Sequence, residues 1–367
     1  MALKKKIDRP FVFIVIVLVV VGFFIFTSAS LGLLARDGPK FSTVAFNQLF
    51  LGIILGTVAL LITSHINYRF WRKYSFFIFL FSIVTTLLVF VPGFGIEFSG
   101  AKRWLSLGFL PSFQPAELLK LSFVIYFAAW LSGIRNHIHE WRYGIAPLLI
   151  LLGVIGAILL AQPDTGTFLV IFVTAIAMFV VAGARLRDLA ILGAVSAGSI
   201  ALLALIRPYV MERLLTFINP ASDPLGTSYQ IQQSLIAIGS GQIFGRGFGQ
   251  SIQKFNFLPE AMGDSIFAVA AEEFGFVGSL ILIALFLTLA FRGLSIASKA
   301  PDYFGGLLVV GIVMLIVSQS FINIASMLGV FPLTGLPLLF ISQGGSALLF
   351  TLAGIGIILN ISKYSKR

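Results

Sequence analysis

The chain has 367 residues, of which 58% are hydrophobic and 11% are charged, and its mean hydropathy is +1.03. This composition excludes an ordinary soluble globular protein, and the complete lack of cysteine excludes disulfides and thiolate metal sites. The formal net charge of +11 does not indicate a nucleic-acid-binding protein, because the lysines and arginines are scattered over short loops and form no basic face.

Ten apolar runs, most of them close to the ~20 residues that cross a bilayer, predict ten membrane-spanning helices. The first run, Pro10 to Ala35, follows Lys4, Lys5, Lys6 and Arg9 and is expected to be an uncleaved signal anchor. The other nine are expected at about 44–66, 74–93, 116–134, 145–162, 167–183, 188–206, 265–291, 303–324 and 345–362. The predicted fold is an all-α, polytopic membrane bundle that forms a single domain over residues 1–367.

The loop charges predict the orientation of this bundle. With a cytoplasmic N-terminus, sixteen lysines and arginines fall on the inner side and eight on the outer side. Since inner loops carry the excess of positive charge, both termini are expected in the cytoplasm. The two long polar loops, at about 94–115 and 207–264, then lie on the outer side, and any chemistry that they carry takes place there.

The loop at about 207–264 is too long to be a simple connector. Within it, Ser228 to Ile238 places three aliphatic residues on one helical face, which predicts a short helix at the membrane surface. The glycine-rich piece from Gly239 to Gly249 has neither the GxGxxG nor the Walker spacing of a nucleotide site. It predicts the tight turns of a re-entrant loop instead.

The stretch from Phe257 to Gly278 contains Glu260, Asp264, Glu272 and Glu273 at the entrance of the eighth predicted span. Asp264 directly precedes the apolar run, and the sequence leaves open whether it caps that helix or acts in catalysis. Glu272 and Glu273 follow about 12 Å deeper along a helix. Because carboxylates at that depth need a partner or water, they predict either a polar cavity or an ion pair, and we favour a functional cavity.

A second polar group precedes and enters the fourth predicted span. Glu117 and Lys120 are three residues apart, so they share a helical face and could pair with each other. The alternative is that Lys120 reaches an anion or a carboxylate of the eighth span. Lys102 and Arg103 would then bind a phosphate-bearing group at the outer surface.

Five blocks of sequence resemble the SEDS proteins (shape, elongation, division and sporulation), the family that includes FtsW, RodA and their sporulation relative. The blocks cover nearly the whole chain and are Gly100 to Lys120, Gln162 to Thr167, Asn219 to Ile238, Gly239 to Gly278 and Gly335 to Ser346. The stretch Gly249 to Lys254 is more similar to the division protein FtsW than to the elongation protein RodA.

The resemblance implies a peptidoglycan glycosyltransferase that polymerises lipid II, a lipid-linked disaccharide-pentapeptide, at the outer face of the cytoplasmic membrane during septal wall synthesis. The catalytic aspartate of the family falls on Asp264. This chain departs from the family pattern at Met262-Gly263, where the family has His-Thr, and at Gln343, where the family has Tyr. Without a histidine to share the proton, Asp264 is left as the base.

Growth of a glycan chain requires a base near the attacking sugar hydroxyl and positive charge near the departing undecaprenyl diphosphate. We expect Asp264 to be the base. Substrate binding is expected of Arg103 first, and then of Lys102, Glu117, Lys120, Arg213, Arg246, Lys254, Glu260, Glu272 and Ser342. A divalent cation such as Mg²⁺ or Mn²⁺ could bridge a carboxylate and the diphosphate, although the sequence has no dedicated ligand cluster.

The expected partners are lipid II, the growing glycan strand, a transpeptidase of the class B penicillin-binding proteins and other division proteins. The expected location is the bacterial cytoplasmic membrane at the division septum. Two other functions stay open, a lipid II flippase and a non-catalytic scaffold for a transpeptidase. A flippase would need polar groups through to the cytoplasmic half, whereas the intramembrane charges cluster toward the outer side.

Overall fold

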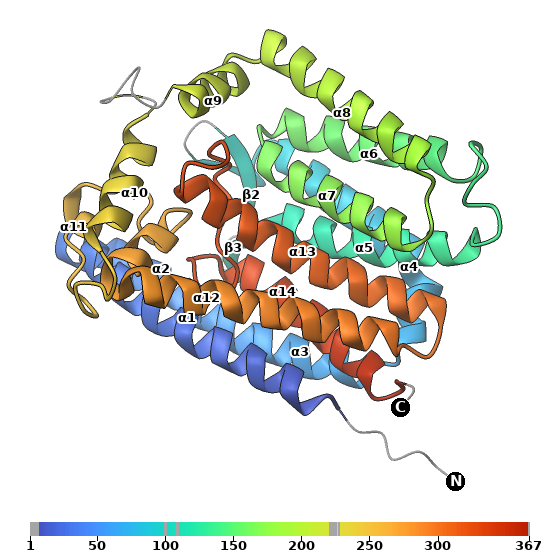
Figure 1. Cartoon of the computed structure of the whole chain (residues 1–367), viewed down its shortest axis with the longest axis horizontal. Coiled ribbons are helices and arrows are strands. Elements are labelled where there is room, and N and C mark those ends of the chain that lie inside the picture. The colour runs from blue at the N-terminus through green and yellow to red at the C-terminus, as the bar shows by residue number, and fades with distance from the viewer. Residues whose placement is uncertain (1–6, 99–100, 108–109, 220–225, 227, 366–367) are drawn as a thin grey trace.

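The structure is a computed structural model that describes residues 7–98, 101–107, 110–219, 226 and 228–365. Long helices lie side by side in an elongated bundle, and both ends of the chain lie at the same end of it (Figure 1). Lys4, Lys5, Lys6 and Gly100, which enter the sequence-based predictions, lie outside the described residues.

Ten apolar segments of the described chain match the ten predicted spans. Eight are long and apolar enough to cross a membrane: α1 (Arg9–Arg36), a segment made of α2, η1 and α3, α4 (Tyr68–Leu87), α5 (Pro115–Gly133), α8 (Leu186–Ile206), α12 (Ile266–Ser298), α13 (Tyr303–Met327) and α14 (Gly345–Ser362). Two shorter apolar helices are α6 (Ile145–Ala161) and α7 (Thr165–Val181). The predicted all-helical, polytopic membrane fold is confirmed.

The second span changes its helix type along its length. It begins as α2 (Gly38–Asn47), continues as the π-helix η1 (Gln48–Leu55) and ends as α3 (Gly56–His65). Gln48 is buried at the start of η1, where its Nε2 donates to the carbonyl of Ser342 (3.3 Å) and its Oε1 accepts from the backbone N–H of Gly344 (2.9 Å). The π-helical turn therefore fixes the loop that precedes α14.

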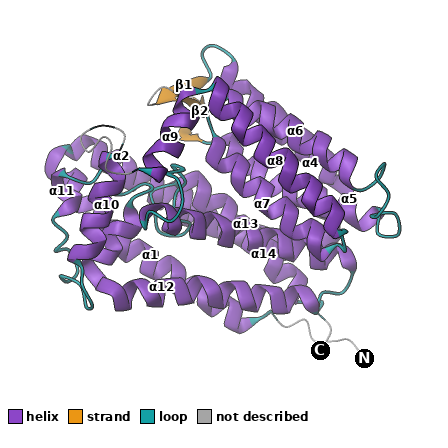
Figure 2. Cartoon of the chain, turned by 45° about the horizontal axis from the view of Figure 1, so that its top comes forward, coloured by secondary structure: helices purple, strands orange, loops and turns teal. Residues whose placement is uncertain are grey.

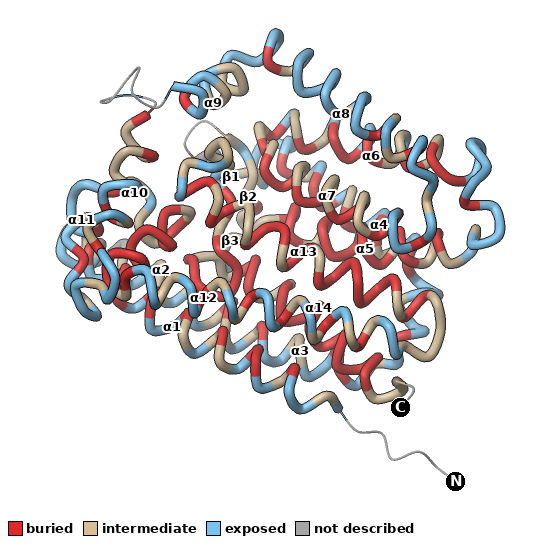
Figure 3. Tube along the Cα trace, in the orientation of Figure 1, coloured by how far each residue is buried: buried red, intermediate tan, exposed pale blue. Residues whose placement is uncertain are grey.

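The centre of the bundle is formed by α13 and α14, whereas α8 lies at its edge with most of its surface exposed (Figure 3). α14 packs against α3, and α13 packs against α5, α7 and α12. Gly356 permits the α3–α14 contact, because an added Cβ would lie 2.0 Å from Thr63 Oγ1 and 2.4 Å from the carbonyl of Leu60. Small residues let membrane helices approach closely in this way.

The loop at about 94–115 folds into a small antiparallel sheet, which the helical prediction did not include. Its strands are β1 (Gly95–Phe98), β2 (Ala101–Leu107) and β3 (Leu110–Phe113), in the order β1-β2-β3. Gly95 lies opposite Leu105, which also lies opposite Phe113. The single turn η2 (Leu88–Phe90) leads into the sheet, which lies near α9 at the end of the bundle away from the termini (Figure 2).

In its described part, the long polar loop contains three helices, α9 (Pro208–Ile218), α10 (Tyr229–Ser240) and α11 (Gln253–Asn256). α10 confirms the helix predicted for this part of the loop. It buries Ile231, Ser234 and Ala237 and packs against α12. The loop is therefore joined to the bundle by side-chain packing and does not merely cross its surface.

Replacing Gly356 with alanine is expected to destabilise the protein by about 1–3 kcal/mol, because overpacking forces α3 away from α14. The matched control is Gly153→Ala in α6, where an added Cβ meets nothing within 4 Å and alanine is the better helix former. Thermal unfolding of the detergent-solubilised protein measures both variants. Equal melting temperatures for the two variants would contradict the close α3–α14 contact.

Candidate active site

Asp264 lies at the end of the long loop, two residues before α12. The N-cap position of α12 is occupied by Ser265 and not by Asp264, and Ser265 makes no side-chain capping bond. Its backbone is held from inside the bundle, because Asn323 Nδ2 on α13 donates to the carbonyls of both Asp264 and Leu336 at 2.7 Å. The interpretation of Asp264 as a helix cap is therefore wrong, and its side chain serves another purpose.

The loop before α14 holds the same segment from a second side. Ser342 Oγ donates to the carbonyl of Gly263 (2.6 Å) and accepts from the backbone N–H of Leu338 (2.8 Å). The backbone N–H of Gln343 donates to the carbonyl of Met262 (2.8 Å). Ser342 is buried and thus fastens the two loops together, which is a different role from the predicted contact with substrate.

The carboxylate of Asp264 is partly buried between α10 and the loop before α14. Gln230 Nε2 on α10 donates to Asp264 Oδ1 (3.1 Å) and to Ser265 Oγ (3.0 Å). Gly335, which has a φ of 69°, packs beside the other carboxylate oxygen, since an added Cβ would lie 4.0 Å from Oδ2. A side chain at residue 335 would strain the backbone, while its Cβ would only be in ordinary contact with the carboxylate.

The pKa of Asp264 is raised to about 6, mainly by burial and also by the nearby carboxylate of Glu260, while Gln230 and Arg213 act in the opposite direction. The removal of a carboxylate from water disfavours its charged form, whereas a donor or a cation favours it. With its pKa near 6, Asp264 is mostly ionised at neutral pH and is a stronger base than an exposed aspartate. A base of this strength suits proton abstraction near pH 7.

Two arginines from different elements belong to the charged surroundings of this carboxylate: Arg213 acts on Asp264 through its charge, and Arg103 acts on Arg213. Arg213 on α9 donates through Nη1 to the carbonyl of Thr334 (3.4 Å), and its guanidinium carbon lies 5.9 Å from the ring centre of Tyr209. Burial and the positive charge of Arg103 lower the pKa of Arg213, while Tyr209, Asp264 and Asp164 raise it. These groups therefore form one electrostatic cluster.

Arg103 on β2 is fixed by the turn between α6 and α7. Its Nε donates to the carbonyl of Gln162 (3.1 Å), and its Nη2 donates to the carbonyl of Pro163. Asp164 in the same turn is buried and accepts from Gln114 Nε2 (3.3 Å) and from the backbone N–H of Thr167 (3.1 Å). The small sheet thus orients an arginine toward the cluster around Arg213.

The site contains residues that the sequence-based prediction missed, namely Asp164, Tyr209, Gln230, Asn323 and Gly335 as neighbours of Asp264 and its two arginines. The available signal was weak but present. Asp164, Gln230 and Gly335 lie inside the sequence blocks that carry the family resemblance, and Asn323 shares an inward helical face with Gln319.

Lys120 and Glu117 form the local pair that the sequence analysis left as one alternative. Lys120 Nζ lies 2.8 Å from Glu117 Oε2 and donates to Gln319 Oε1 (2.5 Å), and both charged side chains are buried. Gln319 Nε2 in turn donates to the carbonyl of Pro337 (3.0 Å). In the described part of the chain, Lys120 reaches no carboxylate of α12, so it supports the loop before α14.

Lys254 is also engaged by a buried partner. Its Nζ lies 2.7 Å from Glu273 Oε1 and donates to Ser28 Oγ on α1 and to the carbonyl of Gly249, both at 2.9 Å. Ser28 Oγ itself donates to the carboxylate of Glu273. The sequence analysis favoured a functional cavity around this carboxylate, and the structure corrects this to an ion pair that joins α1, α11 and α12.

Glu272 is hydrogen-bonded by the segment that leads into α11. Ser251 Oγ donates to Glu272 Oε2 (2.6 Å), the backbone N–H of Ile252 donates to Oε1 (3.1 Å), and that of Gln253 donates to Oε2 (3.3 Å). Arg246 Nε lies 3.6 Å from Glu272 Oε1. Glu272 and Arg246 therefore hold the glycine-rich loop in place.

The glycine-rich loop packs on a break in α12. Gly275 has a φ of 67° and interrupts the helix, so the carbonyls of Glu272 and Glu273 accept from the backbone N–H groups of Arg246 and Gly247, both at 3.0 Å. Gly245 has a φ of 82°, and an added Cβ would lie 2.1 Å from the carbonyl of Glu273. Glycine is required here because the loop backbone touches the helix backbone.

Two predicted residues remain at the surface. Lys102 Nζ lies 4.0 Å from Glu97 Oε2, and both side chains are more than half exposed. Glu260 is exposed and has a φ of 48°. It lines a cavity of about 230 Å³ together with Lys254, Met262 and Gln343. The negative charge of Glu260 raises the pKa of Asp264.

The donor set near Asp264 does not fit a metal ion held by the protein. Among the described residues, no three histidine, cysteine, aspartate or glutamate side chains are grouped closely enough to bind one. The amide nitrogen of Gln230 and the positive charge of Arg213 act on Asp264, and neither of these donor groups can ligate a cation.

The Lys254→Met variant is expected to lose about 3–5 kcal/mol of stability, because it leaves Glu273 charged, buried and without its cation. The double variant Lys254→Met/Glu273→Leu is expected to recover most of this loss, since removing both charges is far less costly than removing one. Thermal unfolding of the single and double variants measures the coupling. Additive losses in the double variant would show that the two side chains do not depend on each other.

The family model described as a cell cycle protein of the FtsW, RodA and SpoVE type matches residues 9–367. The chain is 38% identical to stage V sporulation protein E of Bacillus subtilis over 99% of both chains. It is 40% identical to the probable peptidoglycan glycosyltransferase FtsW of Geobacter metallireducens over 85% of this chain and 83% of the relative.

Two solved structures share the fold. A chain of a peptidoglycan synthase complex, solved to explain how polymerization and crosslinking are coordinated, has a TM-score of 0.78 and 28% identity, with 97% of this chain and 98% of that chain covered. The rod shape determining protein RodA of Thermus thermophilus has a TM-score of 0.71 and 28% identity, with 99% and 98% covered. On its sequence and its fold, the chain belongs to the FtsW/RodA/SpoVE family, the SEDS proteins.

Proposed function

We propose that this protein is a peptidoglycan glycosyltransferase that polymerises lipid II into glycan strands. The observation that carries the proposal is the position of Asp264, whose backbone is anchored from inside the bundle and whose carboxyl has its pKa raised to about 6 beside Arg213. Relatives at 38–40% identity include proteins named as probable peptidoglycan glycosyltransferases, which supports the same chemistry.

In the proposed reaction, the ionised carboxylate of Asp264 takes the proton from the attacking hydroxyl of the acceptor sugar. The oxygen of that hydroxyl forms a bond to the anomeric carbon of the donor, and the bond from this carbon to the diphosphate oxygen breaks. Arg213 and Arg103 stabilise the negative charge that develops on the departing undecaprenyl diphosphate. Asp164 and Gln162 hold this region in place through the contacts of the α6–α7 turn.

The proposed orientation places both termini in the cytoplasm and Asp264 at the outer face of the membrane. The excess of positive charge in the predicted inner loops supports it. α9, α10 and the start of α12 lie at the end of the bundle that is opposite to both termini (Figure 1), and Asp264 directly precedes α12, so they share one side of the membrane in this orientation.

A role in septal wall synthesis together with a class B penicillin-binding protein and other division proteins remains part of the proposal. One similar solved chain comes from a peptidoglycan synthase complex, which supports a transpeptidase partner. The similarities to a sporulation protein and to division proteins, at 38% and 40% identity, are too close to each other to separate these two roles.

A divalent cation, Mg²⁺ or Mn²⁺, that bridges a carboxylate and the diphosphate stays a prediction. The residues around Asp264 supply no ligand cluster, so the ion would have to arrive with the substrate diphosphate, and no step above depends on it. Polymerisation in the presence and absence of EDTA tests this expectation. An equal rate in both samples would remove the ion from the proposal.

The two departures from the family pattern are neighbours in space. The backbone N–H of Gln343 donates to the carbonyl of Met262 (2.8 Å), and both side chains line the cavity of about 230 Å³ beside Glu260. Where the family has a histidine, Met262 has a thioether, which cannot transfer a proton. Gln343, the other departure, lies directly next to Met262. Asp264 carries the proton transfer alone in the proposed mechanism.

The Asp264→Asn variant is expected to polymerise lipid II about 10²–10⁴ times more slowly, because it lacks the general base. Its stability at neutral pH is not expected to fall. The folded pKa of Asp264 is raised above the reference value of 3.8, so its ionisation opposes folding as pH rises from about 3.8 to about 6.

The matched control is Glu212→Gln, which removes an exposed carboxylate from α9 at the same end of the bundle. A gel assay of glycan products from purified protein, with and without a class B penicillin-binding protein, measures the activity. Full activity of the Asn variant would disprove the assigned base, and no polymer from the wild type with any partner would favour the scaffold function.

The pH profile gives a separate test of the electrostatic cluster. The rate is expected to rise with pH through about 6, as Asp264 becomes ionised. Since the positive charge of Arg213 lowers the pKa of Asp264, Arg213→Gln is expected to move this rise to higher pH and also to slow the reaction. Arg142→Gln removes an exposed cation from the other end of the bundle and is expected to leave the profile where it is. An unchanged profile in Arg213→Gln would place Arg213 outside the cluster.

A further inference from the structure

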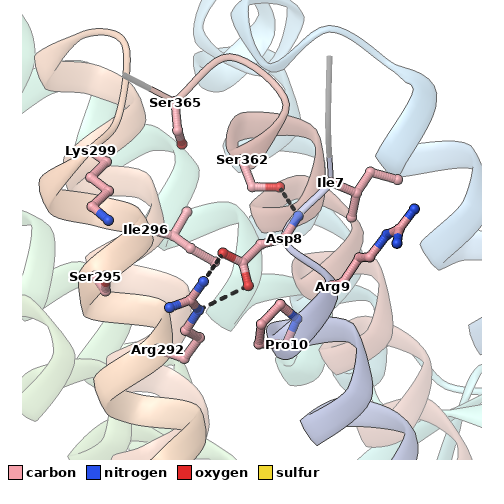
Figure 4. A pocket seen from close by; sticks show the side chains of 10 residues that line it. All are labelled: Ile7, Asp8, Arg9, Pro10, Arg292, Ser295, Ile296, Lys299, Ser362 and Ser365. Atoms are coloured by element: carbon pink, nitrogen blue, oxygen red, sulfur yellow. Dashed lines mark hydrogen bonds and ion pairs between the residues drawn. The ribbon is translucent and has the colours of Figure 1, made fainter. Parts of the chain in front are cut away.

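A cavity of about 310 Å³ lies at the end of the bundle that carries both termini, far from Asp264. It is formed by the start of α1, the last turns of α12 and the end of α14 (Figure 4). Its lining consists mostly of charged and hydroxyl side chains, including Asp8, Arg9, Arg292, Ser295, Lys299 and Ser362. None of these residues takes part in the proposed glycosyl transfer.

The cavity has an excess of positive charge. Arg292 donates through Nε and Nη2 to the two carboxylate oxygens of Asp8, at 2.9 and 2.7 Å, so this pair is neutral as a unit. The backbone N–H of Asp8 donates to Ser362 Oγ (3.2 Å), which joins the pair to α14. Within the described residues, Arg9 and Lys299 form no ion pair, so they supply the net charge.

Exposed aromatic side chains lie deeper along both helices on the sides that carry these cations. On α1, Phe13 follows Arg9 by four residues, about 6 Å along the axis, and is 68% exposed. On α12, Phe291, Ser295 and Lys299 are spaced by four residues and share one face, and Phe291 is 70% exposed. Each helix therefore presents a cation at its end and an apolar surface toward the middle of the membrane.

We propose that this cavity binds the head group of an anionic phospholipid. Lys299 contacts the phosphate, Ser295 donates its hydroxyl hydrogen, and the acyl chains run along Phe291. Arg9, on the other side of the Asp8–Arg292 pair (Figure 4), adds its positive charge. Basic pockets between membrane-spanning helices are suited to anionic head groups. A free phosphate would use the same cations but would gain nothing from the apolar surface beneath them, so the arrangement favours the lipid.

The test uses the full-length protein in detergent and follows its melting temperature during titration with a short-chain phosphatidylglycerol. Parallel titrations use phosphatidylcholine of the same chain length and inorganic phosphate. Phosphatidylglycerol alone is expected to raise the melting temperature. Since each cation near an anionic head group contributes roughly fivefold in affinity, Lys299→Gln is expected to need roughly five times more lipid, and Arg9→Gln/Lys299→Gln roughly 25 times more.

The matched control is Arg142→Gln/Arg185→Gln, which removes two exposed cations from other loops at the same end of the bundle and is expected to respond like the wild type. The proposal is overturned if the cavity variants respond like this control, or if phosphatidylcholine acts as well as phosphatidylglycerol. An equal response to inorganic phosphate would show a free-anion site in place of a lipid site. No response of the wild type to any of the three would exclude binding altogether.

Discussion

The geometry of the candidate active site depends on the side-chain amide of Asn323. In an apolar bundle an unpaired carbonyl is costly, and Asn323 Nδ2 satisfies two of them, those of Asp264 and Leu336, at 2.7 Å each. The loop before α12 and the loop before α14 are thereby joined through α13. Gln319, one turn earlier on α13, repeats this support at Pro337 and is itself held by Lys120. Asp264 is positioned from the buried centre of the protein, which gives it the fixed placement that the proposed role as a base requires.

The buried carboxylates of α12 stabilise the structure around the candidate active site and are not part of that site. A charge in the membrane interior is tolerated when a partner and additional hydrogen bonds replace its water. Glu273 has Lys254 and Ser28, and Glu272 has Ser251 and two backbone N–H groups. The same two residues precede the break at Gly275, where the helix leaves their backbone carbonyls free for the glycine-rich loop. The charged residues therefore hold a loop against a helix that has lost part of its own hydrogen bonding.

Whether a feature could be predicted from the sequence depends on how close together in the chain its residues lie. The spans could be predicted because a run of apolar residues is itself the cause of a membrane helix. The Glu117–Lys120 pair could be foreseen as one alternative, since both residues lie on one turn. Arg103, Arg213 and Asp264 were expected in one site from the family resemblance and the charge of the leaving diphosphate. Their contacts and the place of Asp164 could not be foreseen, because they join four segments that no periodicity links. Lys254 was predicted to bind substrate because nothing in the sequence links it to its buried partner Ser28, which lies on the first helix. The small sheet was missed because its strands, of four, seven and four residues, are too short for a clear alternation.

The strength of Asp264 as a base is a compromise between two opposing groups of neighbours. Gln230 and Arg213 favour the charged carboxylate, which keeps it ionised but makes it a weaker base, whereas burial and Glu260 have the reverse effect. A histidine at residue 262 could have shared this task, and Met262 cannot. In this chain the balance must therefore be set by the surroundings of a single carboxyl group. A bound diphosphate on Arg213 would neutralise one of the groups that lower the pKa of Asp264. The proposed base would then become stronger when the donor substrate is in place, which links proton transfer to occupancy of the site.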